Sequence, residues 1–372
     1  MKYALGRRVF TAQQPDYRRR VERLRRLLKK RRCSALLVTD INNIRYLTGF
    51  TGSNAQVVLT EKKGLFLTDS RYSTQAASEV REGFRVRVYR KKPLDALARS
   101  LSGLGLSCVG FVETGLSFGS YVKLKKALRP VRLRPLPDLV GEIRAVKEPS
   151  EVESIRGAVL VLELAFKKIE RVLKPGMTEK EAAFLAEVEM RRRGARGTAF
   201  ETIVASGPRS ALPHGKASEK RIKTGELVVV DMGASVGGYN SDETRTYCTG
   251  RVGSEEKKIF RTVVEAHSRA VERIKAGVKA SDVDAAARSH IRKAGYGRFF
   301  GHGTGHGVGL DIHESPNIGP MSTDVLEEGM VMTVEPGIYV PGLGGVRIED
   351  MVLVTKDGPE ILTNSPKELR SL

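Results

Sequence analysis

The chain of 372 residues has few cysteines and no long apolar run, and both features limit the classes of protein to which it can belong. Cys33, Cys108 and Cys248 are odd in number and far apart in the sequence, which indicates neither a disulfide framework nor a paired metal motif. We interpret them as reduced, mostly buried thiols. No segment reaches the roughly 18 apolar residues of a membrane span, and the first residues lack the apolar core of a signal peptide. We therefore expect a cytoplasmic protein without membrane contact.

Acidic side chains are scarce in the first part of the chain. Residues 1–140 hold 30 lysines and arginines against 10 aspartates and glutamates, whereas residues 141–372 hold 34 against 33. Because the chain is longer than one core usually supports, this asymmetry predicts two domains, 1–140 and 141–372. A polyanionic partner of the basic first domain, such as a nucleic acid, is one interpretation, and a solvated basic surface is the other.

The first domain alternates between strand and helix patterns, which predicts an α/β fold. Residues 18–32 carry apolar side chains at spacings of three and four and read as an amphipathic helix. Residues 42–55 (NNIRYLTGFTGSNA) read as turn-rich. Strands are expected at 34–40, 55–60, 63–69 and 84–89, and a further helix is expected at 71–80.

The second domain combines long helices with strands and turns, which predicts an α+β fold. Ser150 and Glu153 have the spacing of a capping box, so a long helix is expected to begin near Ser150. Further helices are expected within 178–194 and 255–277. His267 and His290 lie in helical stretches, and we interpret both as structural.

Two aspartates are predicted to lie on one hairpin. With a Val236-Gly237 loop, Asp231 lies opposite Asp242, and with a Gly237-Gly238 loop the two are diagonal neighbours. Both registers bring the carboxylates close together on one face. A cation must then lie between them, or one must take up a proton.

A second hairpin repeats this construction. Glu335 and Glu349 are symmetric about Gly342, and a three-residue loop would place them opposite each other. Between the two hairpins in sequence lies GHGTGHGVGLDIHE (301–314), which holds three of the six histidines among five glycines. Two divalent cations would balance the negative charge of the four carboxylates, and His306 would add a neutral imidazole ligand. This donor set predicts a two-metal hydrolytic centre.

These segments are similar to those of the pita-bread metallopeptidase family, which includes methionine aminopeptidase, aminopeptidase P, prolidase and creatinase. The motifs VVVDMGASVGGYNSDETRT, GHGTGHGVGLDIHE, TVEPGIY and GGVRIEDMVLV follow one another in the family's order. IRYLTGFTGSNA and LFLTDSRY resemble the creatinase/prolidase-type N-terminal domain of Xaa-Pro peptidases. The resemblance covers essentially the whole chain. It implies an α/β first domain, an α+β pita-bread second domain and a homodimer.

The resemblance also implies a role for each matched residue. Asp242 and Glu349 would bridge two metal ions, Asp231 would hold one of them, and His306 with Glu335 would hold the other. Glu335 is also the expected general base. Mn²⁺ is the expected metal, with Co²⁺ or Zn²⁺ as alternatives.

Further residues are expected around this centre. By resemblance, His302 and His313 contact the substrate and stabilise the scissile carbonyl, and His214 from VASGPRSALPHGKAS completes the wall. Arg347 lies on the same strand face as Glu349 and is expected to fix nearby carboxylates. Glu243 departs from the family, which often has an apolar residue there, but it removes no ligand.

The implied activity is hydrolysis of the Xaa-Pro bond at the N-terminus of proline-containing peptides, by metal-activated hydroxide, as in aminopeptidase P. The alternative is a prolidase restricted to Xaa-Pro dipeptides. A non-catalytic binding or chaperone-like relative is a third interpretation, which the retention of the complete ligand set opposes because unneutralised buried carboxylates are costly. A creatinase-like amidinohydrolase is a fourth, and it would need no metal.

Overall fold

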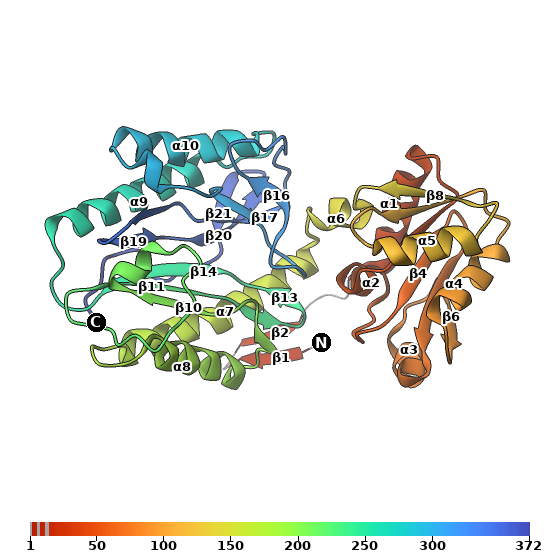
Figure 1. Ribbon diagram of the computed structural model, residues 1–372, viewed down its shortest axis with the longest axis horizontal. Coiled ribbons are helices and arrows are strands. Elements are labelled where there is room, and N and C mark those ends of the chain that lie inside the picture. Colours follow the sequence, from red (N-terminus) through yellow and green to blue (C-terminus); the bar gives the residue numbers. More distant parts are fainter. Residues whose placement is uncertain (1, 6–7, 12–14) are drawn as a thin grey trace. The chain divides into compact units, whose positions relative to one another are not determined.

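The structure is a computed structural model that describes residues 2–5, 8–11 and 15–372 (Figure 1). It divides into two compact units, of which the first comprises Pro15–Arg144 and the second Ala145–Leu372 together with strands β1 and β2. Residue 140, where the composition places the boundary, lies inside helix α6 (Leu139–Arg144). That helix packs against α1 and α2 of the first unit, so the division falls at its end.

The first unit is built on one mixed sheet with the strand order β6-β5-β4-β3-β7-β8. Strand β3 pairs parallel with β7 and antiparallel with β4, and side chains from these strands pack with α4 and α5 into one core. The α/β class expected for this domain is confirmed. Its elements are α1 (Tyr17–Lys30), β3 (Ala35–Val38), α2 (Ile41–Thr48), β4 (Gln56–Thr60), β5 (Gly64–Asp69), α3 (Ser73–Glu79), β6 (Phe84–Tyr89), α4 (Pro93–Ser102), β7 (Cys108–Val112), α5 (Phe118–Ala127), β8 (Arg132–Leu136) and α6.

The turn-rich interpretation of residues 42–55 is wrong for the first half of that segment, which is helix α2. Asp40 caps the helix, because its side chain accepts a hydrogen bond from the backbone N–H of Asn43. Gly49 ends it with a φ of +80°, the left-handed conformation that glycine adopts without strain. Ile44 and Leu47 are fully buried. The helix therefore depends on its two caps and a short apolar face, which the polar asparagines obscure in the sequence.

The basic excess of the first unit lies mainly on its surface. Along α1, Arg18, Arg19 and Arg26 are exposed, as a solvated face requires. Arg20 is the exception, because it is 1 % exposed, donates to the Tyr46 carbonyl and lies 3.9 Å from the centre of the Tyr46 ring. A polyanionic partner for the exposed arginines stays a prediction.

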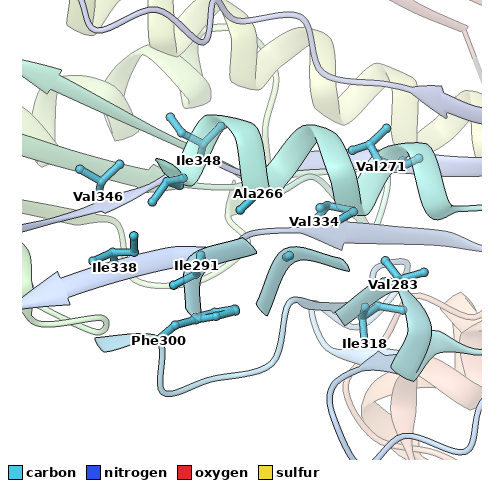
Figure 2. Packing of buried hydrophobic residues seen from close by; sticks show 14 of the residues in the cluster. Ala266, Val271, Val283, Ile291, Phe300, Ile318, Val334, Ile338, Val346 and Ile348 are labelled. Atoms are coloured by element: carbon cyan, nitrogen blue, oxygen red, sulfur yellow. The ribbon is translucent and has the colours of Figure 1, made fainter. Parts of the chain in front are cut away.

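The second unit sandwiches its strands between two pairs of helices (Figure 1). The sheet β10-β11-β14 packs against α7 and α8, and the sheet β16-β15-β17-β20-β21 packs against α9 and α10. Figure 2 shows the second of these cores, where Ala266 of α9 and Ile291 of α10 lie near Val334 and Ile338. The α+β class expected for this domain is confirmed.

The elements of the second unit begin with the hairpin of β1 (Lys2–Leu5) and β2 (Arg8–Thr11). Its helices are α7 (Pro149–Val172), α8 (Glu179–Arg192), α9 (Ser254–Arg273) and α10 (Ala280–Lys293). Its remaining strands are β9 (Gly197–Thr198), β10 (Ile203–Ser206), β11 (Leu227–Met232), β12 (Ala234–Val236), β13 (Tyr239–Asn240), β14 (Glu243–Cys248), β15 (Gly305–Gly307), β16 (Glu314–Ile318), β17 (Val331–Val334), β18 (Gly337–Val340), β19 (Gly344–Arg347), β20 (Asp350–Thr355) and β21 (Gly358–Ile361).

Helix α7 begins earlier than its sequence suggests. Its N-cap is Glu148 and not Ser150, because Pro149 occupies the first helical position and the Glu151 carboxylate accepts from the backbone N–H of Glu148. Ser150 lies inside the first turn. Among the residues that the structure describes, no helix combines the length and the apolar composition of a membrane span.

Candidate metal centre

The first acid-bearing hairpin adopts the second of the two registers allowed by its sequence. Val236 pairs with Tyr239, so the loop consists of Gly237 and Gly238, with φ values of +59° and +89°. Two successive left-handed residues match the right-handed twist of the strands, which explains the glycine pair. On the adjoining ladder Asp231 pairs with Thr244, so Asp242 is its diagonal neighbour.

The second hairpin has the predicted three-residue loop and register. Val340 pairs with Gly344, and Gly342 in the loop has a φ of +82°. The pairs Gly337–Arg347 and Val334–Asp350 flank the two acids on either side. Glu335 therefore lies opposite Glu349, as the symmetry about Gly342 predicts.

Strand β15 brings His306 to these acids. It pairs with β17, the strand that leads into Glu335, and a side chain at Gly305 would collide with the Thr333 carbonyl. Glycine is therefore required where the two strands approach most closely. The Nε2 atom of His306 lies 3.4 Å from Glu335 Oε1 and 3.6 Å from Asp242 Oδ2.

All five predicted ligands line one cavity of about 750 Å³, together with the other predicted site residues. Asp242, His306 and Glu349 each offer a ligand atom within 4.8 Å of the others. The nine predicted residues that the structure brings together there are His214, Asp231, Asp242, His302, His306, His313, Glu335, Arg347 and Glu349.

The imidazole of His306 has the orientation that a metal ligand needs. Its Nδ1 atom lies 3.1 Å from the Gly307 carbonyl oxygen, which can only accept, so Nδ1 carries the proton. The lone pair of Nε2 then faces the carboxylates of Asp242 and Glu335. Burial lowers the pKa of His306, which keeps the ring neutral near pH 7.

The acids of this cavity lack enough positive charge among their protein neighbours. Burial, followed by repulsion from Glu349, raises the pKa of Asp242 well above its usual range. Burial, followed by repulsion from Glu335, does the same for Glu349, and burial also raises the pKa of Glu335. Asp231 Oδ1 is buried and has no hydrogen-bond partner among the described residues. Four carboxylates, one imidazole and an unsatisfied oxygen fit divalent cations that prefer oxygen and nitrogen ligands.

Arg347 supports the centre from one side, as its strand position predicts. It is 3 % exposed, and its Nη2 atom donates to Asp231 Oδ2 at 2.6 Å. Its Nε donates to the Thr244 hydroxyl, and that hydroxyl donates to Glu349 Oε2 at 2.6 Å. The guanidinium therefore fixes two of the acids, Asp231 directly and Glu349 through Thr244.

Tyr339 joins Arg347 to His302, a role that was not predicted from the sequence. Its hydroxyl accepts from Arg347 Nη1 at 2.8 Å and lies 2.9 Å from His302 Nε2. Because the Gly303 carbonyl takes the proton of His302 Nδ1, the Tyr339 hydroxyl donates to Nε2. The even spacing from Glu335 was a signal that Tyr339 shares its strand face, but a strand tyrosine is more often part of a core.

Replacing Tyr339 by Phe should lower kcat about 10-fold while the metal content stays that of the wild type. Without the hydroxyl, His302 loses the contact that sets its ring, and one Arg347 donor is left unpaired in a buried site. Steady-state rates and elemental metal analysis on the same preparation would measure both quantities. Tyr247→Phe is the matched control, because this buried hydroxyl contacts Glu170 outside the cavity. Equal losses of kcat in the two variants would contradict the role of Tyr339.

The three remaining histidines of the cavity have different surroundings. Both ring nitrogens of His302 are engaged within the protein. His313 is exposed and its ring centre lies 4.2 Å from that of His306, and His214 is exposed on another part of the wall. Partial desolvation by the cavity wall, followed by the neighbouring His306, lowers the pKa of His313. His313 and His214 are therefore better placed than His302 to offer an imidazole N–H to a substrate.

Glu243 points to the opposite face of β14 from Asp242 and joins a buried ion network. Its Oε1 atom lies 2.7 Å from Arg245 Nη2, and its Oε2 atom accepts from the Ser365 hydroxyl. Arg245 also bonds Asp350 at 2.7 Å. Burial raises the pKa of Glu243 to about 7. The departure from the family at this position therefore affects the buried ion network next to the hairpin, and it leaves the set of metal ligands intact.

His267 and His290 lie outside the cavity, in helices α9 and α10. His267 Nε2 lies 3.0 Å from Asp350, and His290 Nε2 lies 3.0 Å from Glu265. Both contacts link elements of the fold. They agree with the structural interpretation of these two residues.

Buried carboxylates around one imidazole, on two hairpins of an α+β unit, define the class as a metal-dependent hydrolase. Comparison with known families narrows that class. Residues 153–356 match the model of metallopeptidase family M24, and residues 20–146 match the creatinase/prolidase N-terminal domain. The chain belongs to metallopeptidase family M24, and it is an enzyme with the pita-bread fold of that family.

Individual relatives resemble the chain along almost its whole length. An Xaa-Pro dipeptidase of Pyrococcus horikoshii is 37 % identical, over 94 % of this chain and 98 % of the relative. The solved structure of an Xaa-Pro dipeptidase from Bacillus anthracis is 41 % identical with a TM-score of 0.93, over 96 % and 100 % of the two chains. That of an X-Pro aminopeptidase from Thermotoga maritima is 40 % identical with a TM-score of 0.87, over 95 % and 99 %. Two of these three proteins are named Xaa-Pro dipeptidase, and those two names favour the dipeptidase alternative over aminopeptidase P.

Proposed function

We propose that this metallopeptidase hydrolyses Xaa-Pro dipeptides, as a prolidase does. The convergence of four carboxylates and the His306 imidazole in one cavity carries the proposal, because that donor set suits hydrolysis at a metal centre. The relatives named Xaa-Pro dipeptidase support the dipeptide over a longer substrate. The second candidate is the Xaa-Pro aminopeptidase activity, which the similar enzyme of Thermotoga maritima favours.

The proposed centre would hold two divalent cations, with Mn²⁺ as the first choice and Co²⁺ or Zn²⁺ as alternatives. Asp242 and Glu349 would bridge the two ions, with Asp231 on one ion and His306 with Glu335 on the other. When bound, the ions supply a hydroxide nucleophile at neutral pH and polarise the scissile carbonyl.

The chain's own side chains then handle protons and orientation. We assign to Glu335 the acceptance of the proton that leaves the attacking water, and its transfer to the departing proline nitrogen. The exposed imidazoles of His313 and His214 donate to the carbonyl oxygen as negative charge develops on it. Tyr339 holds His302 and Arg347 together, so that His302 keeps its position in the cavity lining and Arg347 keeps the carboxylates in place.

The cavity also offers apolar contacts for a proline ring. A peptide bond that precedes proline lacks an N–H and carries a rigid ring, so shape and apolar surface must replace a backbone hydrogen bond. Phe200, Ile203, Pro213 and Ile312 line the cavity that contains the acids. These side chains are our candidates for the surface that selects proline.

A direct test compares an Xaa-Pro dipeptide with the matching Xaa-Pro-Xaa tripeptide, using protein loaded with Mn²⁺. We expect the dipeptide to be cleaved with a kcat/KM at least about 10-fold above that of the tripeptide, a difference of about 1.4 kcal/mol in transition-state binding. Chelation should abolish both rates. A preference for the tripeptide would favour the aminopeptidase hypothesis. Hydrolysis that resists the chelator would contradict the proposed metal centre.

The predicted homodimer and the predicted polyanionic partner have their own measurements. The homodimer stays a prediction that light scattering tests. A nucleic-acid contact of the basic first unit would show as binding with a steep dependence on salt, because each neutralised phosphate releases counterions. Absence of peptidase activity in metal-loaded protein, together with such binding, would favour the non-catalytic alternative.

A further inference from the structure

Two of the three cysteines, although far apart in sequence, lie next to each other in the first unit. The Sγ atoms of Cys33 and Cys108 are 3.1 Å apart, and the side chains are 75 positions apart in the chain. Cys33 precedes strand β3 and Cys108 begins its parallel neighbour β7. The backbone N–H of Ser34 donates to the Cys108 carbonyl at 3.2 Å, so hydrogen bonding holds the two strand starts together.

We propose that Cys33 and Cys108 form a disulfide that closes the centre of the first unit. Their sulfur atoms are only about 1 Å further apart than the bond length of a disulfide. Cys33 is 9 % exposed and Cys108 4 % exposed. Once formed, the bond is shielded from reducing thiols.

The surroundings favour a structural bond over a catalytic one. Burial, together with the hydrogen bond shared with Cys108, raises the pKa of Cys33 to about 11. A reactive dithiol has the opposite property, because a lowered pKa stabilises the reduced form and makes the disulfide strongly oxidising. Here Arg134 favours the thiolate of Cys33, but burial outweighs it, so the thiol form prevails near pH 7. The bond is therefore expected to form slowly in the folded protein and to resist reduction.

The reaction needs an oxidant, which we take to be a small disulfide such as oxidised glutathione. One cysteine thiolate attacks the small disulfide, releases one small thiol and forms a mixed disulfide. The second thiolate then attacks the protein sulfur of that mixed disulfide and releases the second small thiol. The protein loses two electrons and two protons, and both electrons leave on the released thiols. The closed loop includes β3, β4, β5 and β6, so the cross-link restricts much of the unfolded first unit.

The test counts thiols in the full-length, metal-loaded protein after incubation with oxidised glutathione. The protein is then denatured in acid, and its free thiols are alkylated and counted by intact mass. We expect a single alkylated residue, Cys248, and a mass lower by two hydrogen atoms, against three alkylated residues in the reduced protein. The oxidised protein should also unfold about 10 °C higher, and dithiothreitol added under denaturing conditions should reverse the bond.

Matched variants identify the pair. Cys248→Ser should form the bond and leave no free thiol, whereas Cys33→Ser should keep both of its remaining thiols. Three free thiols after oxidation, a glutathione adduct as the final state, or a bond that involves Cys248 would each overturn the proposal. An unchanged unfolding temperature in protein that carries the bond would overturn its stabilising role. Peptidase activity provides a separate readout, because no residue that lines the catalytic cavity belongs to the first unit.

Discussion

Glu335→Gln is expected to reduce kcat for an Xaa-Pro dipeptide by at least about 10³-fold. Glutamine keeps the shape of the side chain but removes the charge that lies 3.4 Å from His306 and the site that accepts a proton. General-base catalysis alone contributes about 10² to 10⁴ in rate, and the loss of an anionic ligand adds to that effect. Steady-state kinetics in saturating Mn²⁺ would measure the loss, with elemental analysis to report how much metal remains.

The matched control for this substitution is Glu360→Gln. Glu360 is an exposed residue of β21 that pairs with Arg156 at 2.7 Å and lies outside the cavity. An exposed pair of this kind contributes little to stability, so the kcat of Glu360→Gln should stay within about twofold of the wild-type value. Retention of more than a tenth of the wild-type kcat by Glu335→Gln would refute its assignment as the general base.

Metal removal should destabilise the protein more strongly as the pH rises. Without cations, burial and mutual repulsion hold the pKa values of Asp242, Glu349 and Glu335 above those of the unfolded chain. The folded state then binds protons more tightly than the unfolded state does. The contribution of these three carboxylates to stability is therefore greatest at low pH and is lost as the pH rises above about 4 and through their folded pKa values. Cations remove this loss because they neutralise the ionised carboxylates.

Thermal unfolding with and without Mn²⁺ provides the measurement. At pH 8 we expect metal to raise the unfolding temperature by about 10 °C, and at pH 5.5 by only a few degrees, because protons compete for the same oxygens. Asp242→Asn should weaken the response to metal and flatten the pH dependence of the metal-free protein. A metal-free protein that is more stable at pH 8 than at pH 5.5 would contradict this account of the centre.

The acid pairs were predictable because their geometry is local. Side chains alternate along a strand, and a turn fixes which residues face each other, so the spacing of Glu335 and Glu349 about Gly342 was sufficient. For Asp231 and Asp242 the sequence allowed two loops, since glycine occurs in both. The left-handed conformations of Gly237 and Gly238 decide between them, and they place the aspartates on a diagonal.

Contacts between distant segments were not predictable in the same way. No spacing rule connects Tyr339 with His302, or brings the sulfur of Cys33 to that of Cys108. A further case is Lys147, whose Nζ atom lies 2.7 Å from Glu314 Oε1 in a pair whose two side chains are only 1 % and 7 % exposed. Such pairs arise from the order of strands and the packing of segments, which depend on the whole chain.

The sequence by itself therefore determined the two fold classes, the acid-bearing hairpins, the residues of the candidate centre and the family. These follow from alternation, turn chemistry and motifs that span a few residues each. Only the tertiary structure decided how the hairpins meet at His306, which donors of Arg347 reach which acids, and which cysteines are neighbours. The physical reason is that a hairpin has one dominant local solution, whereas the meeting of separate hairpins is selected by the burial of a common core.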